Sequence, residues 1–152
     1  MAAVAAGLEL HGRMEVIDGD PPLVLDAAHN PAGAAALAEA LPAVAAGRPV
    51  IACLAVLADK DAGGILTALA PVLGGLVTTE IPADRLASAG RPGARALAAS
   101  ALAEAARDVG IGWVEEVPDP AAAIARANSV ADAQGGVQLV SGSHYLLRYA
   151  IP

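Results

Sequence analysis

The chain has 152 residues, of which 56% are hydrophobic, and its 9 Lys and Arg against 16 Asp and Glu give a formal net charge of −7. This length fits one domain with a single core. The apolar residues are largely alanine, and no run approaches the ~20 residues needed to cross a bilayer. The basic residues are scattered, which argues against a nucleic-acid surface. Because the start also lacks a basic secretion signal, we expect a cytoplasmic protein without a membrane or nucleic-acid partner.

The first half of the chain predicts a hairpin followed by a strand–helix–strand unit. Residues 13–17 and 23–26 are close enough to pair as an antiparallel edge. Asn30 suits the N-cap and Pro31 the first position of an alanine-rich helix over 34–41. A loop over 42–48 then leads to a second buried strand over 50–57, which contains the single cysteine, Cys53, as a small core residue.

The second half of the chain continues the alternation of strands and helices. Asp61 can cap a helix that runs to about Leu73, and Asp119 with Pro120 opens another that runs to about Ala133. The remaining expected elements are a strand over 76–79, a long connection over 81–92, a helix over 93–109, an edge strand over 113–117 and a last strand over 137–140. This order predicts a doubly wound, Rossmann-like three-layer α/β domain, with a mostly parallel sheet and one antiparallel edge strand.

Polar residues gather where three apolar strands end. Asp26 and His29 follow the first parallel strand, Lys60 lies between two aspartates after the second, and Ser143 and Tyr145 follow the last. In a parallel sheet these ends share one edge, where α/β proteins bind ligands and helix N-termini favour anions. Ordinary turn residues at a strand–helix junction, and a solvated surface lysine, are the alternatives.

Lys60 is the only lysine beside eight arginines, which suggests a need for a compact ammonium. The sequence has neither a G-x-x-x-x-G-K-[ST] nor a G-x-G-x-x-G nucleotide motif, and no G-x-S-x-G elbow. One cysteine and three separated histidines give no zinc pattern. We therefore expect no metal ligands in this chain.

Four motifs, taken together, resemble one known family. They are Gly12-Arg13, then 26–31 (D-A-A-H-N-P), 57–61 (L-A-D-K-D) and 142–145 (G-S-H-Y). In this order they are similar to the C-terminal, glutamate ligase domain of folylpolyglutamate synthase/dihydrofolate synthase, within the Mur ligase superfamily. The family more often has glycine where Ala27 stands, and the resemblance covers nearly the whole chain.

The resemblance implies half of an ATP-dependent ligase that joins L-glutamate to folate, dihydrofolate or dihydropteroate through an acyl phosphate. It implies that residues 1–152 form a single domain, inactive by itself. ATP and Mg²⁺ would be held mainly by an N-terminal P-loop domain that this chain lacks. The implied nucleotide-binding residues are Arg13, Asp26, His29 and Asn30, and the implied glutamate-binding residues are Asp59, Lys60, Ser143 and Tyr145.

Two other functions remain open at the level of sequence. One is a Mur-type ligase domain that serves another acceptor, such as a peptidoglycan precursor or a cyanophycin-like polymer. The other is a free-standing Rossmann-like module that binds a small molecule or an anion without catalysis. The D-K-D and G-S-x-Y motifs favour the folate enzymes over other Mur ligases.

Overall fold

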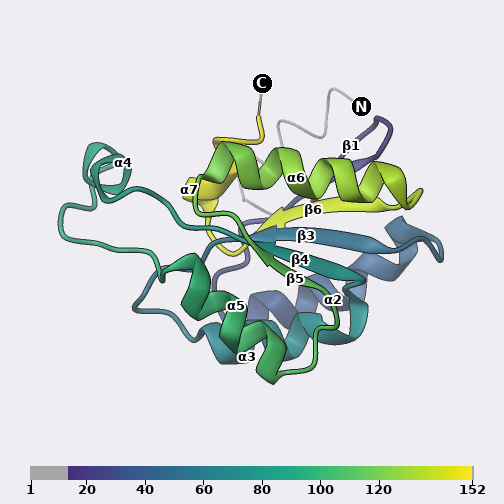
Figure 1. The fold of residues 1–152 in the computed structure, drawn as a ribbon, viewed down its shortest axis with the longest axis horizontal. Helices are drawn as coiled ribbons and strands as arrows, with labels where there is room; N and C mark the ends of the chain where they lie inside the picture. Colours follow the sequence, from purple (N-terminus) through teal and green to yellow (C-terminus); the bar gives the residue numbers. More distant parts are fainter. Residues whose placement is uncertain (1–13, 152) are drawn as a thin grey trace.

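A computed structural model describes residues 14–151 as a six-stranded sheet between two layers of helices (Figure 1). The strands are β1 (Glu15–Ile17), β2 (Leu23–Leu25), β3 (Val50–Leu54), β4 (Gly75–Thr78), β5 (Val114–Glu116) and β6 (Val137–Ser141). Their order across the sheet is β1-β2-β6-β3-β4-β5. β1 pairs antiparallel with β2, and every other neighbouring pair is parallel. The expected mostly parallel sheet with one antiparallel edge strand is confirmed, as is the place of β5 at an edge.

The helices divide between the two faces of the sheet. They are α2 (Pro31–Ala45), α3 (Ala62–Leu69) with a 3₁₀ turn after it (Ala70–Val72), α4 (Ala83–Ser88), α5 (Ala99–Asp108), α6 (Pro120–Ala133) and α7 (His144–Leu147). In Figure 1, α2, α3 and α5 cover one face, α6 and α7 lie on the other, and α4 projects from the end where β6 finishes. None of the helices in residues 14–151 is long and apolar enough to span a membrane.

The core has one half on each side of the sheet and is built from aliphatic side chains. Leu37 and Leu41 of α2 pack with Ile65 and Leu66 of α3 in one half. In the other half, residues of β2, β3 and β4 pack with α6 and α7. Cys53 is fully buried there, and burial raises the pKa of its thiol to about 12. It is the small core residue that the sequence predicts.

Side-chain caps start three helices where the sequence predicts them. Asn30 Oδ1 accepts from the Gly33 amide at 2.7 Å, Asp61 Oδ1 from Gly64 at 2.9 Å, and Asp119 Oδ2 from Ala122 at 2.9 Å. Each bond satisfies an amide that has no partner inside its helix, which is worth about 1 kcal/mol. These caps are local in sequence, and the starts of α2, α3 and α6 follow from them.

The helix α2 is longer than expected, because it continues through Pro42 to Ala45. A proline inside a helix costs about 3 kcal/mol, since it removes one hydrogen bond and crowds the preceding turn. Leu37 and Leu41 are buried against the sheet, and full burial of each contributes about 1.5–3 kcal/mol. Pro42 itself faces solvent. Burial on the opposite side of the helix therefore offsets the proline.

The segment between β4 and α5 differs most from the expectation. The connection over 81–92 contains the short helix α4, and the helix expected from Gly93 begins only at Ala99. Gly93 has a φ of 83°, and residues 95–97 pair with residues 56–58, which follow β3. The Leu97 amide donates to Val56 O at 2.8 Å and the Ala58 amide to Arg95 O at 2.8 Å.

This pairing also explains why β3 is shorter than the apolar run over 50–57. Val56 and Leu57 are buried, but they pair with the 95–97 segment and not with a strand of the sheet. Burial of the run was a correct expectation, and its assignment to one continuous strand was wrong. A local pattern of apolar residues reports burial and does not identify the hydrogen-bond partner.

The approach of β6 to the chain beyond β3 depends on Gly142. Its φ is 96°, and a Cβ atom placed there would lie 2.3 Å from Ala55 O. We expect Gly142→Ala to lower the free energy of unfolding by clearly more than Gly110→Ala. Gly110 has a similar φ of 92° with open space around it, so alanine there carries only the left-handed strain of about 1–2 kcal/mol.

Urea denaturation of the two variants provides the test. Because both carry the same strain, the difference between them isolates the clash with Ala55. Equal losses of stability would mean that the backbone contact at Gly142 relaxes freely.

Candidate functional site

The carboxyl ends of β2, β6 and β3 lie side by side at one edge of the sheet. In the sheet register Leu25 is opposite Val140, and Leu54 is opposite Ser141. The Asp26 amide continues this pairing by donating to Val140 O at 3.2 Å. The residues that follow these three strands are therefore brought together, as the sequence predicts for a shared edge.

Asp26 is half-buried directly after β2, and local amides hold its carboxylate. Its Oδ1 accepts from the Ala28 amide at 2.7 Å. Burial raises the pKa of the Asp26 carboxyl above its ordinary value, and hydrogen bonds from the Ala28 and Met14 amides partly counteract that rise. These bonds fix the direction of the carboxylate and connect the turn to the start of β1.

The turn that leads from Asp26 into α2 positions His29 and Asn30. The His29 ring Nδ1 is 3.1 Å from Ala27 O, so the imidazole is held against its own turn. Asn30 is the N-cap of α2 described above, and both residues are exposed. The Asn30 side chain thus has a structural duty at the helix start, whereas His29 presents its ring to the surface.

The D-K-D segment forms a tight turn between β3 and α3. The Lys60 amide donates to Leu57 O at 3.0 Å, and Asp61 caps α3. This turn lies against the start of α2, since a Cβ atom on Gly64 would be 2.6 Å from Pro31 Cγ. The two motifs, which are far apart in the sequence, are therefore packed against each other through the first turns of α2 and α3.

Ser143 and Tyr145 follow β6 at the start of the short helix α7. Ser143 is almost fully buried, and its Oγ accepts from the Tyr145 amide at 3.2 Å. Gly142 places this turn directly over Ala55, beyond the end of β3. Ser143 is thereby held toward the segment that carries Lys60.

These three turns enclose a cavity of about 90 Å³, which we call the strand-end cavity. It brings together four residues that the sequence predicts for the site, His29, Lys60, Ser143 and Tyr145. The other lining residues are Leu57, Arg91, Gly142 and His144.

The remaining predicted residues do not line this cavity. Asp26 and Asn30 lie in the adjacent turn, and Asp59 is exposed at the surface. Arg13 lies outside the described residues. The roles of all these residues stay predictions.

Arg91 and His144 are the two lining residues with titratable side chains that sequence reasoning did not select. His144 occupies the variable position of the G-S-x-Y motif, so the motif residues on either side of it indicated that it lies at the site. Arg91 comes from the long connection after β4, and no local pattern indicates that this connection folds back over the strand ends. Its amide donates to Leu86 O at 2.8 Å, which ties it to the end of α4.

The strand-end cavity carries positive charge in an acidic protein. Burial lowers the pKa of His144, and the positive charges of Arg148, His29 and Arg91 lower it further.

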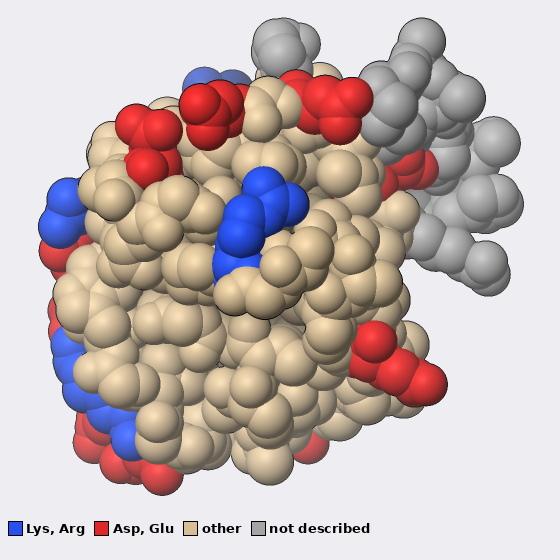
Figure 2. All heavy atoms as spheres, turned by 90° about the vertical axis from the view of Figure 1, so that its right-hand side faces the viewer, with Lys and Arg blue, Asp and Glu red and all other residues tan. Residues whose placement is uncertain are grey.

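No cluster of three or more His, Cys, Asp or Glu side chains within residues 14–151 could hold a metal ion. Figure 2 shows the opposite end of the molecule, where acidic and basic side chains are scattered among uncharged ones. The geometry thus suits an anionic ligand at the strand ends.

Comparison with known proteins agrees with this geometry. Residues 12–144 match the family described as Mur ligase, glutamate ligase domain. The chain therefore belongs to the Mur ligase glutamate ligase domain family. It is also 48% identical over 68 residues to the dihydrofolate synthase/folylpolyglutamate synthase of Mycobacterium tuberculosis, a match that covers 45% of this chain and 14% of that protein.

Solved structures give the same relationship over more of the chain. The M. tuberculosis folylpolyglutamate synthase complexed with ADP and AMPPCP has a TM-score of 0.77 and 35% identity, over 92% of this chain and 31% of that one. The Yersinia pestis bifunctional enzyme complexed with AMPPNP and Mn ion has a TM-score of 0.74 and 29% identity, over 91% and 30%. E. coli FolC in complex with DHPP and ADP has a TM-score of 0.75 and 25% identity, over 91% and 30%. The chain spans less than a third of the length of these relatives.

We expect the His144 imidazole to titrate below its ordinary pKa of 6.5, because burial and the positive charges of Arg148, His29 and Arg91 disfavour its charged form. Since the folded state then binds this proton less tightly than the unfolded state, the contribution of His144 to stability is kept above pH 6.5 and lost as the pH falls below it. An NMR titration of the ring should show the midpoint rising in Arg148→Gln. Arg48→Gln is the matched control, because Arg48 precedes β3 at the end of the sheet away from the cavity.

A midpoint that moves equally in both variants would show that the effect is one of net charge and not of the cavity. Added salt should also raise the midpoint in the unmodified chain, because it screens the exposed guanidinium groups.

Proposed function

We propose that this chain is the glutamate-binding domain of an ATP-dependent ligase that joins L-glutamate to folate, dihydrofolate or dihydropteroate. The observation that carries the proposal is the strand-end cavity, which gathers Lys60, Ser143 and Arg91 from three separate segments. Glutamate brings two carboxylates and one nucleophilic amine to the reaction. An ammonium, a guanidinium and a hydroxyl suit such a ligand, because charge-assisted hydrogen bonds are the stronger ones.

In this proposal the domain contributes mainly by positioning. A carboxylate of the acceptor is phosphorylated by ATP, and the glutamate amine then displaces phosphate from the acyl phosphate. Lys60 and Ser143 would hold the glutamate so that its amine meets the acyl carbon, and Tyr145 would form a wall beside it. Fixing two reactants in one geometry supplies much of such a rate enhancement.

The nucleotide side of the site is proposed for the turn before α2. Asp26 would accept from a donor on the nucleotide, and His29 and Arg13 would approach its phosphates, with Asn30 shaping the turn. ATP and Mg²⁺ would be held mainly by an N-terminal P-loop domain, which is the proposed partner of this one. Relatives crystallised with ADP, AMPPCP or AMPPNP support a nucleotide in the complete enzyme.

We expect the purified 152-residue chain to show no ATP-dependent glutamylation, because it lacks a phosphate loop. Fusing it to the N-terminal part of the M. tuberculosis enzyme, in place of that enzyme's own C-terminal domain, should restore incorporation of labelled glutamate into a folate. The N-terminal part of the M. tuberculosis enzyme without this chain is the negative control. Glutamylation by the isolated chain, or a folded fusion that hydrolyses ATP yet never transfers glutamate, would contradict the proposal.

In the active fusion, Lys60→Ala should raise the KM for glutamate about ten- to a hundredfold and leave the KM for ATP nearly unchanged. The reason is that a hydrogen bond to a charged group contributes roughly 1.5–3 kcal/mol when it pairs an ammonium with a carboxylate. Lys60→Arg should restore only part of this loss, since the planar fork is larger than the ammonium.

Arg48→Ala serves as the control for net charge, because it removes a cation at the other end of β3. Asp26→Ala should act on the KM for ATP instead. An unchanged glutamate KM in Lys60→Ala would make the D-K-D turn a purely structural feature, and the glutamate site would lie elsewhere.

A further inference from the structure

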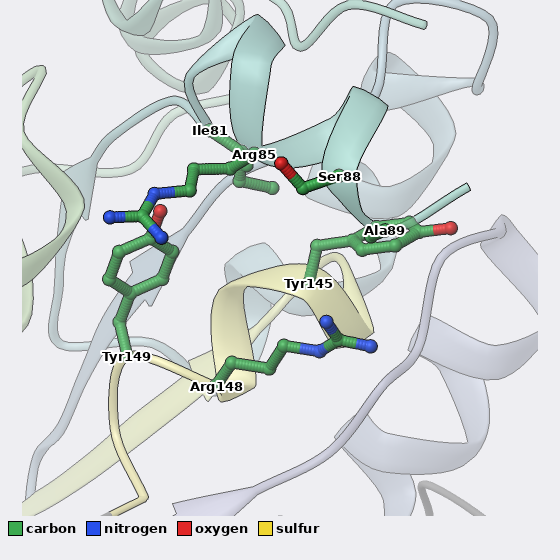
Figure 3. A pocket seen from close by; sticks show the side chains of 7 residues that line it. All are labelled: Ile81, Arg85, Ser88, Ala89, Tyr145, Arg148 and Tyr149. Atoms are coloured by element: carbon green, nitrogen blue, oxygen red, sulfur yellow. The ribbon is translucent and has the colours of Figure 1, made fainter. Parts of the chain in front are cut away.

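A second and larger cavity, of about 280 Å³, lies between α4 and α7, and we call it the α4–α7 cavity. Arg85, Ser88 and Ala89 line it from α4, and Tyr145, Arg148 and Tyr149 line it from α7 and the residues after it. Figure 3 shows Arg85 and Tyr149 pointing toward each other across the cavity, with Tyr145 and Arg148 on the α7 side. Of the residues in the four sequence motifs, Tyr145 alone lines this cavity.

The charged groups of this cavity are both cationic. Arg85 and Arg148 are exposed, and neither makes an ion pair with any carboxylate within residues 14–151. The guanidinium carbon of Arg148 lies 5.8 Å from the centre of the Tyr145 ring, which gives that side chain a fixed platform. Two guanidinium groups without a carboxylate partner give this cavity positive charge in a chain of net charge −7, and they suit an anion from outside.

The hydroxyl groups of the cavity indicate which kind of anion would fit it. Ser88 Oγ already donates to Asp84 O at 2.8 Å, so it offers only an acceptor. The hydroxyls of Tyr145 and Tyr149 stand on side chains that line the same space. Planar guanidinium forks match the two oxygens of a carboxylate, and the tyrosine hydroxyls add further donors.

The α4–α7 cavity adjoins the strand-end cavity. Tyr145 lines both, and Arg148 is close enough to His144 of the strand-end cavity to disfavour its protonation. The strand-end cavity by itself, at about 90 Å³, is far smaller than the roughly 300–1,000 Å³ of ordinary ligand pockets. The two adjoining cavities together fall within that range.

We propose that the α4–α7 cavity is a carboxylate subsite, in which Arg85 and Arg148 bind an acidic group of the ligand whose other end occupies the strand-end cavity. This inference rests on the proposed function, because that function supplies a ligand with several carboxylates. The carboxylate has two possible sources, the second carboxylate of a single glutamate or the carboxylates of an oligo-γ-glutamyl tail.

The test is an NMR titration of the 152-residue chain with two probes, glutarate and tri-γ-L-glutamate. Both should shift the resonances of Ser88 and Tyr149, and the neutral diamide glutaramide should not. In Arg85→Gln/Arg148→Gln the affinity should fall by about fivefold for each arginine, as for an exposed ion pair. Arg85→Lys/Arg148→Lys should keep part of it, and Arg48→Gln should match the unmodified chain.

The two probes distinguish the sources of the carboxylate. An equal loss for both probes in the double Gln variant assigns the subsite to a glutamate-sized dicarboxylate. A loss confined to tri-γ-L-glutamate assigns it to the tail.

The inference is overturned if neither probe shifts Ser88 and Tyr149, or if the double Gln variant binds both probes as the unmodified chain does. If that variant does not fold, the unmodified chain still tests the inference, because glutarate and tri-γ-L-glutamate should shift Ser88 and Tyr149 and glutaramide should not. The proposed function and the subsite can fail separately. If the fusion transfers no glutamate but glutarate binding still depends on the two arginines, the proposed function is wrong and the subsite remains.

Discussion

The last strand of the chain, β6, pairs in parallel with β2 on one side and β3 on the other, and this double pairing organises the site. It aligns the ends of three strands that are separated by up to about a hundred residues of sequence, so that three turns meet over one edge of the sheet. Gly142 completes the arrangement, because only a residue without a Cβ atom can pass Ala55 O so closely. Without β6 in this place, Ser143 would have no fixed position relative to Lys60.

The helix starts give the same edge its rigidity. Asn30 and Asp61 each cap a helix with a short hydrogen bond, and the first turns of α2 and α3 pack through Pro31 and Gly64. The polar turns therefore rest on two helices that are themselves anchored in the core by Leu37, Leu41, Ile65 and Leu66. A site carried by rigid elements can orient a small substrate, which is what ligation by positioning requires.

Positive charge distinguishes the edge of the sheet where the parallel strands end from the rest of the molecule. The chain has a net charge of −7, yet Lys60, Arg91, Arg85 and Arg148 line two adjoining cavities at that edge. Burial lowers the pKa of His144, and the positive charges of Arg148, His29 and Arg91 lower it further. A local positive field in an acidic protein attracts anionic ligands in preference to their neutral analogues.

The sequence by itself determined the alternation of strands and helices, the starts of α2, α3 and α6, and the family. Caps such as Asn30 and Asp119, apolar runs and short motifs act over a few neighbouring residues, so they can be recognised locally. Four of the eight residues predicted for the site, His29, Lys60, Ser143 and Tyr145, line one cavity. They meet there because the strands before them are parallel and end at one edge of the sheet, as the sequence predicts.

Only the tertiary structure decided where Arg91, Arg85 and Arg148 lie and where α5 begins. These features depend on the path of the connection after β4, which is set by its pairing with Val56 and Leu57 and by the packing of α4 near α7. Such contacts join residues far apart in the chain, and no periodicity or cap in the sequence encodes them.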